Sequence, residues 1–261
     1  MDLLDSLVSL VNDQKKQFLM LIKFGSEENL KHLRCGKVYM KNLKFYNDLE
    51  EKGGSGKPDR YDGKWRMNNA RIQITDPQTN RLIATGMAPS ITMSYGYEKC
   101  PIFCLFGYDY RNCDSFSVDK EHNSCRIQTS FSNEQKCKLK KGLGEYALVV
   151  LDTNSFFKRI DAAFKAEGIE YLLKSVRYNT GNSKERVESI IQDSRNIAFN
   201  KDVDNFEYQQ EIRFFITNRP VEDHLIVSAR SLEDITQIIS TDDLLRSRIE
   251  LIQEFTNLSA H

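Results

Sequence analysis

The segment Phe206–Ile216 has the longest strand pattern in the chain and constrains the fold more than any other segment. Successive side chains of a β-strand point to opposite faces of the sheet. The predicted core face comprises Phe206, Tyr208, Ile212, Phe214 and Ile216, and the polar face comprises Glu207, Gln209, Glu211 and Arg213. A strand this long and apolar is expected near the centre of a sheet, with Gln209 and Glu211 side by side on its polar face.

Two interpretations of this polar face stay open. In the first, it is the solvated outer face of a half-buried strand. In the second, it is the wall of a cleft in which the carboxylate of Glu211 lies beside the amide of Gln209, with Arg213 able to pair with the carboxylate. A carboxylate held in this way can accept a hydrogen bond from a sugar hydroxyl, and it can stabilise positive charge that develops at a glycosidic carbon.

The rest of the sequence alternates between short strand and helix patterns. Strands are predicted at 17–24, 37–40, 91–95, 101–106, 124–129, 146–151, 171–178 and 224–227, with a hairpin at 71–85. Helices are predicted at 26–36, 152–168 and 184–199, with Ser26 and Asp152 as N-caps. Because the strands outnumber the helices and a hairpin is present, we expect an α+β fold rich in antiparallel strands.

A single domain is expected over residues 1–261, because no repeat or low-complexity segment divides the chain. Its predicted additions are an N-terminal helix at 1–16, a flexible loop at 51–64 and two C-terminal amphipathic helices at 231–239 and 242–256. The loop contains Gly53–Pro58, which lacks the spacing and the hydroxyl of a phosphate-binding loop. A flexible connection is therefore the favoured interpretation of this segment.

The composition excludes several classes of protein. With 37 Lys and Arg against 37 Asp and Glu, the chain has no net charge, which argues against binding nucleic acid by bulk electrostatics but leaves room for a local basic groove. No apolar stretch approaches the ~20 residues of a membrane span, and the acidic N-terminus is unlike a secretory signal. The six cysteines lack the spacing of a zinc site, and no His pair follows them. We therefore expect a cytoplasmic protein with no metal and no membrane partner.

Gln209-Gln210-Glu211 is similar to the Q/E-x-E element of ADP-ribosyltransferases, in which the last glutamate contacts the nicotinamide ribose of NAD⁺. Further segments resemble, in the same order, the motifs of a widespread bacterial family with an ADP-ribosyltransferase-like fold. These are Leu21–Phe24 (x-Y-K-Y), Leu30–Met40 (L-x-x-G-x-I-Y-F), Leu43–Asp48 (the F-N-D-P turn), Ser175–Tyr178 (K-V-x-Y) and Lys201–Arg213 (K-x-x-x-[FW]-x-Y-E-x-E-x-R). Each motif is short, and their shared order carries the resemblance.

The resemblance implies a fold of split antiparallel β-sheets with flanking helices, and NAD⁺ as co-substrate. It implies that Glu211 and Gln209 are catalytic, and that Lys23, Phe24, Tyr46, Asn47 and Arg213 bind NAD⁺. The chain departs from the pattern at Lys23, where ADP-ribosyltransferases usually have Arg or His; a lysine binds phosphate as a point charge but cannot form the arginine fork. It also departs at Phe103–Phe106, which lacks the serine of the usual middle strand.

Relatives of this fold act as bacterial toxins on protein, DNA or RNA, often in toxin–antitoxin or anti-phage systems. The resemblance therefore implies a toxin or phage-defence effector that transfers ADP-ribose to a macromolecule and has an antitoxin or other neutralising protein as a partner. Aromatic residues between 95 and 110 and the basic run 136–141 could bind a single-stranded nucleic acid, although hairpin core residues beside a solvated loop are the favoured interpretation of these segments. RNA is slightly favoured over protein as acceptor, because the zero net charge fits a modest local groove and no protein-recognition motif is visible. Two alternatives stay open: an NAD glycohydrolase without a macromolecular acceptor, and an inactive binding module.

Overall fold

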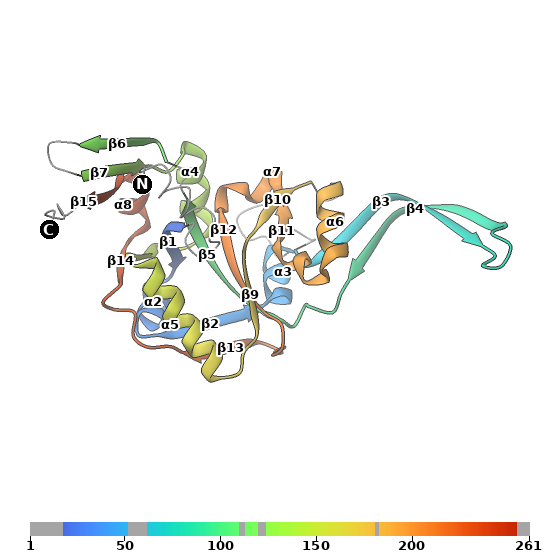
Figure 1. The fold of residues 1–261 in the computed structure, drawn as a ribbon, viewed down its shortest axis with the longest axis horizontal. Coiled ribbons are helices and arrows are strands. Elements are labelled where there is room, and N and C mark those ends of the chain that lie inside the picture. The colour runs from blue at the N-terminus through green and yellow to red at the C-terminus, as the bar shows by residue number, and fades with distance from the viewer. Residues whose placement is uncertain (1–17, 52–61, 110–112, 120–123, 181–182, 255–261) are drawn as a thin grey trace, which may run out of the picture.

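The computed structural model describes residues 18–51, 62–109, 113–119, 124–180 and 183–254 of the 261-residue chain. Its largest element is an eight-stranded sheet in which every pairing is antiparallel. The main path of the sheet runs through β13 (His224–Ser228), β2 (Lys37–Asn42), β5 (Pro101–Asp109), β1 (Phe18–Gly25), β8 (Tyr146–Val150) and β14 (Thr236–Ser240). Two further strands, β12 (Glu211–Ile216) and β9 (Tyr171–Ser175), branch from β5 (Figure 1). The predicted α+β class is confirmed.

Strand β5 is the branch point of this sheet. One of its edges pairs with β12 from Ile102 to Phe106. The other edge is shared, because β1 pairs with it as far as Phe106 and β2 joins it at Ile102. Between these pairings, residues 103–105 have no strand partner on that edge among the described residues. The strands β1 and β2 therefore diverge and leave a gap beside the middle of β5.

Two helices, α2 (Glu27–Arg34) and α5 (Thr153–Ala166), pack on one face of the sheet. The predicted caps are confirmed, because the side chains of Ser26 and Asp152 each accept a hydrogen bond from a backbone N–H in the first turn. The apolar stripes of both helices join residues of β1, β8 and β12 in the main core. The apolar residues that recur at helical spacing in α2 and α5 are thus buried against the same sheet.

The structure describes seven further helical segments. They are α3 (Leu43–Glu51), α4 (Asn133–Gly142), α6 (Lys184–Gln192), η2 (Ser194–Phe199), α7 (Val203–Phe206), η3 (Glu207–Gln209) and α8 (Thr241–Arg246). Apolar side chains of α4 and α8 form a second core cluster with β1, β5 and β8, and α3 and η2 form a third with β5 and β12. Of these helices, α3 and η2 therefore pack beside β12.

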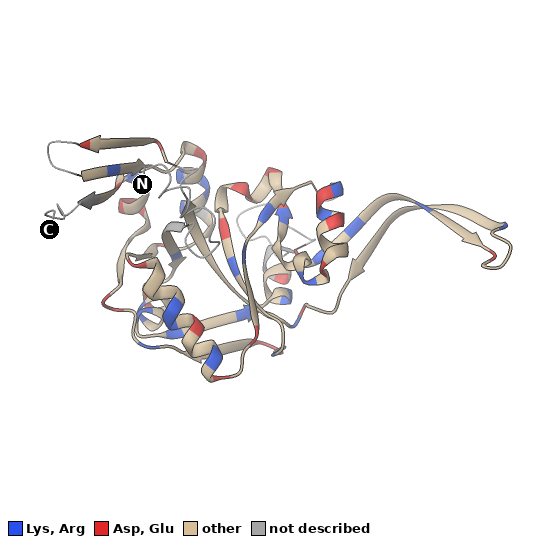
Figure 2. Ribbon diagram, viewed as in Figure 1, with Lys and Arg blue, Asp and Glu red and all other residues tan. Residues whose placement is uncertain are grey.

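Three smaller sheets complete the described structure. They are the parallel pair β10 (Arg177–Asn179) and β11 (Asn200–Asp202), the sheet of β6 (Ser115–Asp119), β7 (Ser124–Thr129) and β15 (Ile249–Glu254), and the hairpin of β3 (Lys64–Thr75) and β4 (Leu82–Ser94). The hairpin projects from the body as a long arm (Figure 1). Charged residues are sparse along its outer part (Figure 2), where large apolar side chains such as Ile74, Ile83 and Met87 are exposed.

Most predicted elements are confirmed, with shifted ends. The strands predicted at 17–24, 37–40, 101–106, 124–129, 146–151 and 224–227 correspond to β1, β2, β5, β7, β8 and β13. The predicted hairpin is longer than expected, because its second strand also includes most of 91–95. The strand predicted at 171–178 is two strands, β9 and β10, separated at Val176, whose N–H donates to the carbonyl of Glu211.

Several predictions are wrong. The segment 231–239 is not a helix, because its β-branched residues form β14 beside β8, and the helix expected at 242–256 ends at Arg246 and is followed by β15. The F-N-D-P-like segment 43–48 is not a turn but part of α3. The basic run 136–141, expected in a loop, lies in α4.

Two predicted segments fall largely or wholly outside the described residues. The expected helix at 1–16 lies entirely outside them, and so does most of the expected loop at 51–64, of which only the ends are described. Among the helices that the structure does describe, none combines the length and the apolar character needed to cross a membrane.

Candidate functional site

Glu211 begins β12, in the middle of the molecule. The expected strand start at Phe206 is wrong, because 203–206 form α7, 207–209 form a 3₁₀ turn, and Gln210 has a left-handed φ of 41° that ends the turn. The strand proper is buried along its whole length, and its apolar residues enter the two core clusters on either face. The solvated outer face considered for this segment is therefore excluded for Glu211 and Arg213, which are 7% and 0% exposed.

Arg213 holds two carboxylates at once. Its Nε donates to Oε1 of Glu211 at 2.7 Å, and its two terminal nitrogens donate to the two oxygens of Asp62 at 2.8 and 3.0 Å. Its third partner is the backbone carbonyl of Ala198, so four of the five N–H donors of the guanidinium are bonded to protein groups. The predicted pairing of Arg213 with Glu211 is thus present, and the two-pronged contact with Asp62 has the geometry of a strong charge-assisted pair.

Lys201 closes the same network from β11. Its ammonium lies 3.0 Å from Oε2 of Glu211 and 3.9 Å from Oδ2 of Asp62, and it donates to the side-chain oxygen of Gln209 at 3.1 Å. The network therefore contains two buried acids and two buried bases, whose charges cancel. Pairing of this kind is what makes buried charge tolerable in a protein interior.

Electrostatics keep Glu211 ionised. Burial by itself raises the pKa of its carboxyl group, but the neighbouring charges of Arg213 and Lys201 outweigh burial and hold the pKa well below its usual range. The thiol of Cys104 also donates to this carboxylate, since burial raises the pKa of Cys104 to about 12 and keeps the thiol protonated. A carboxylate has about four acceptor positions, so these three donors leave room for one more.

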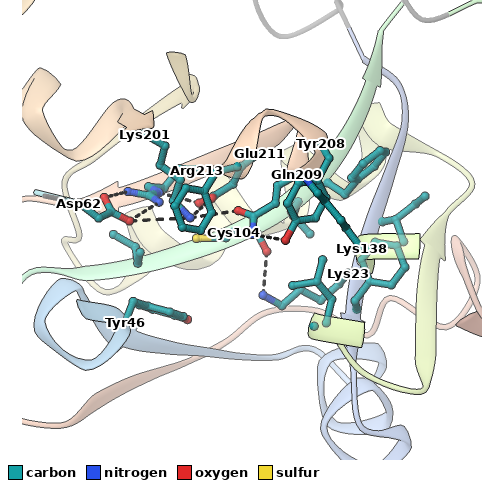
Figure 3. A pocket seen from close by; sticks show the side chains of 18 of the residues that line it. Lys23, Tyr46, Asp62, Cys104, Lys138, Lys201, Tyr208, Gln209, Glu211 and Arg213 are labelled. Carbon is teal, nitrogen blue, oxygen red and sulfur yellow. Dashed lines mark hydrogen bonds and ion pairs between the residues drawn. The ribbon is translucent and has the colours of Figure 1, made fainter. Parts of the chain in front are cut away.

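Lys23 lies at the gap between β1 and β5. Its ammonium donates to the carbonyl of Cys104 at 2.7 Å, on the β5 edge that no strand covers (Figure 3). It also lies 4.9 Å above the ring of Phe103. Burial lowers the pKa of Lys23, and the more distant charge of Glu211 offsets this only in part. An anionic ligand beside Lys23 would supply the charge partner that the described residues do not provide.

A cavity of about 440 Å³ opens between these groups, within the roughly 300–1,000 Å³ typical of ligand sites. Its polar wall contains Lys23, Lys201, Gln209 and Glu211, and its aromatic walls contain Phe24, Tyr46, Phe106, Phe206 and Tyr208. Tyr46 points from α3 toward the cavity (Figure 3). Burial raises the pKa of its hydroxyl, so Tyr46 stays neutral.

The structure brings six of the seven residues singled out from the sequence to this cavity. They are Lys23, Phe24, Tyr46, Gln209, Glu211 and Arg213. The expectation that Gln209 lies beside Glu211 on one strand is wrong. The two side chains are instead linked through Lys201, which contacts both of them. Asn47 stands behind the cavity, where its amide donates to the backbone carbonyl of Asp62 at 3.0 Å. Arg213 lines the cavity, but its hydrogen bonds all go to protein groups, so it holds Glu211 and Asp62 in place.

Three members of the site were missed from the sequence. Asp62 follows a glycine-rich segment and is 151 positions from Arg213, so no local pattern connects the two. In the sequence, Cys104 is one of six cysteines without zinc-site spacing and is part of Phe103–Phe106, and neither observation predicts a carboxylate partner. Lys201 opens the last of the quoted motifs, and that position was the one available signal for a basic partner of Glu211.

The site contains no cluster suited to a metal ion among the described residues, and all six cysteines are free thiols. Its chemical resources are instead an ionised buried carboxylate, an ammonium that has no carboxylate partner among the described residues, and aromatic rings. Comparison of the chain with protein-family models, with curated proteins and with solved structures finds no match.

Proposed function

We propose that this chain is an NAD-dependent ADP-ribosyltransferase in which Glu211 is the principal catalytic residue. The observation that carries the proposal is the state of this carboxylate: buried, held ionised by Arg213 and Lys201, and open to a cavity of about 440 Å³. The branching of β1 and β2 away from β5 also supports a split-sheet fold of the ADP-ribosyltransferase type. The ordered motifs in the sequence point the same way.

Lys23 supports binding of a diphosphate. Among the charged residues of the cavity, Lys201 and Arg213 offset Asp62 and Glu211, and Lys138 pairs with Glu134 at 2.6 Å. Lys23 is left as the cation without a carboxylate partner among the described residues. A ligand with phosphate groups would neutralise it, and the rings of Phe24 and Tyr46 would contact the flat parts of the same ligand.

Glu211 would accept a hydrogen bond from a hydroxyl of the nicotinamide ribose at its remaining acceptor position. Its negative charge would then stabilise the positive charge that grows on the sugar as the bond to nicotinamide breaks. Gln209, held by Lys201, would orient the acceptor group. Arg213 and Asn47 are positioning residues, which act through Glu211 and Asp62.

Replacement of Glu211 by glutamine tests the proposal. It keeps the size of the side chain and removes the charge, so nicotinamide release from NAD⁺ should fall by about 10²-fold or more. The exposed Glu185, which does not line the cavity, provides the matched control as Glu185→Gln. Near-ultraviolet circular dichroism would establish that both variants are folded. Wild-type turnover by a folded Glu211→Gln variant would refute the role of Glu211.

The two alternatives give different outcomes in the same assay. An NAD glycohydrolase releases free ADP-ribose when no acceptor is present, whereas a transferase attaches it to the acceptor. An inactive binding module, which would use the fold only to hold a partner, consumes no NAD⁺ at all. A role as a toxin or phage-defence effector adds a cellular readout: expression should arrest bacterial growth, and Glu211→Gln should abolish the arrest.

A further inference from the structure

The backbone of Glu211 is held differently from that of a regular strand residue. The next residue, Ile212, pairs with Ser175 of β9, so the register places Val176 opposite Glu211. In a hydrogen-bonded antiparallel pair the two residues exchange both of their N–H···O bonds. One of these bonds is present, because the N–H of Val176 donates to the carbonyl of Glu211 at 2.8 Å. The other half of the exchange is replaced by a side chain.

That side chain is Tyr178, whose hydroxyl accepts from the N–H of Glu211 at 2.7 Å. Strand β9 ends at Ser175, and the chain continues as β10, which pairs with β11. The phenol oxygen of Tyr178 thus takes the place that the carbonyl of Val176 has in a regular ladder. Burial raises the pKa of Tyr178, so the group is an uncharged hydroxyl at neutral pH.

The same two strands also hold the carboxylate of Glu211. Tyr178 of β10 lies opposite Lys201 of β11, and the ammonium of Lys201 is 3.0 Å from Oε2 of Glu211. The two opposed residues therefore reach Glu211 at its backbone N–H and at its side-chain oxygen. The amide of Asn179 donates to the side-chain oxygen of Asn200 at 3.2 Å, which joins the two strands beside these residues.

The chain is strained just before this contact. Gln210 has a left-handed φ of 41°, so the 3₁₀ turn and the strand meet at a sharp change of backbone direction. A residue other than glycine in this region is strained. The bond from Glu211 to Tyr178 opposes a shift of the strand start that would relieve this strain, and so it keeps the carboxylate at the cavity.

We propose that Tyr178 is a positioning residue of the transferase: its hydroxyl fixes the backbone of Glu211 and thereby sets where the carboxylate meets the ribose of NAD⁺. The proposal rests on the proposed function, because it concerns the same carboxylate. Tyr178 is not among the described residues that line the cavity, so it acts through Glu211. Loss of its hydroxyl should slow bond breaking and leave NAD⁺ binding nearly unchanged, since Lys23 and Tyr46 are on other elements.

Tyr178→Phe removes the hydroxyl and keeps the ring. The kcat for nicotinamide release should fall by about tenfold, because a small displacement of a catalytic group is costly. The KM for NAD⁺ should stay within about twofold of the wild-type value, since the lost interaction matters mainly in the transition state. Steady-state kinetics would measure both constants, and near-ultraviolet circular dichroism would establish that the variant is folded.

Tyr171→Phe is the matched control. Tyr171 lies on β9 opposite Ile216 of β12, and its hydroxyl donates to Asp161 at 2.7 Å. Burial raises the pKa of this hydroxyl as well. Each variant loses one partly buried hydroxyl that is bonded inside the protein, so a general loss of stability would appear in both. Only Tyr178→Phe should change kcat.

Hydrogen exchange of the Glu211 amide, followed by NMR, tests the contact without reference to turnover. Exchange should be slow in the wild type, at least about tenfold faster in Tyr178→Phe, and unchanged in Tyr171→Phe. If the wild type releases no nicotinamide, the proposed function fails, while exchange that depends on the Tyr178 hydroxyl still supports its hold on Glu211. With an active wild type, a folded Tyr178→Phe of unchanged kcat, or an equal loss in Tyr171→Phe, would overturn the inference. Rapid exchange of this amide in the wild type would overturn it even if Tyr178→Phe does not fold.

Discussion

Arg213 joins two carboxylates that are far apart in the sequence, those of Asp62 and Glu211. Glu211 is its neighbour on the same strand, and their pairing could be predicted because residues two apart share a face. Asp62 is 151 positions away and reaches Arg213 only through the packing of the whole sheet. A local pattern therefore predicts half of this network, and the other half depends on tertiary structure.

Removal of the arginine should be costly. In an Arg213→Met variant, both Asp62 and Glu211 lose a buried partner, so the free energy of unfolding should fall by about 3–5 kcal/mol. Arg195→Met is the control, because Arg195 pairs with Asp193 at the surface and such pairs contribute about 0–1 kcal/mol. Urea denaturation of both variants would measure the difference. Equal losses would show that the buried network does not stabilise the fold.

The same carboxylate predicts a pH dependence. The pKa of Glu211 in the folded chain lies below its ordinary value of 4.5, so the folded state favours the ionised form. Its contribution to stability is fully present above pH 4.5 and declines as the pH falls below that value. The stability advantage of the wild type over Glu211→Gln should therefore shrink between pH 6 and pH 3. Denaturant titrations at both pH values would detect this, and an advantage that grows with acidity would contradict the assignment.

Among the helices and strands, the sequence predicted best those segments whose hydrophobic residues follow a single helical or strand period. Helix α5 has a strong apolar stripe and a capping aspartate, and it was predicted nearly to its ends. The start of the segment 206–216 was mispredicted because Phe206 and Tyr208 alternate as in a strand although residues 203–209 are helical, and the left-handed Gln210 is not visible in an alternation pattern. The segment of β14 looked helical because Ile235, Ile238 and Ile239 recur at helical spacing, but in the sheet Ile238 and Ile239 pack against different core clusters on its two faces.

The contact between β1 and α4 depends on a glycine. Gly144 has a φ of 117°, and a Cβ there would lie 2.6 Å from the carbonyl oxygen of Gly25 at the end of β1. Gly144→Ala should therefore destabilise the fold by about 2 kcal/mol or more. It should also weaken NAD⁺ binding, because β1 carries Lys23 and α4 carries Lys138. Thermal unfolding and a binding titration would measure both effects.

Gly86→Ala is the control for this prediction. Gly86 lies in β4 of the arm, where a Cβ meets nothing within 4 Å and φ is not in the left-handed region. Its replacement should leave stability unchanged or slightly raised, because alanine restricts the unfolded chain. Equal behaviour of the two alanine variants would show that the approach of α4 to β1 does not require a glycine.

At the scale of the whole molecule, the site lies where three core clusters meet, and the arm lies apart from all of them. This arrangement could be predicted only in part. The strands and the hairpin follow from local patterns, but the branching of β5 follows from pairings between segments that are distant in sequence. The cavity is a product of that branching, so its position could not be derived from any single segment.

We predict that the arm formed by β3 and β4 affects the solubility of the protein but not its stability. A two-stranded hairpin contributes little on its own, and no residue of β3 or β4 belongs to the three core clusters. A variant in which residues 70–88 are replaced by Asn-Gly should therefore keep the denaturation midpoint and the NAD⁺ turnover of the full chain. It should also remain monodisperse at higher concentration, because exposed Ile72, Ile74 and Ile83 are lost with their unpaired strand edges. Light scattering and urea titration would measure both properties, and a lower midpoint would mean that the arm stabilises the body after all.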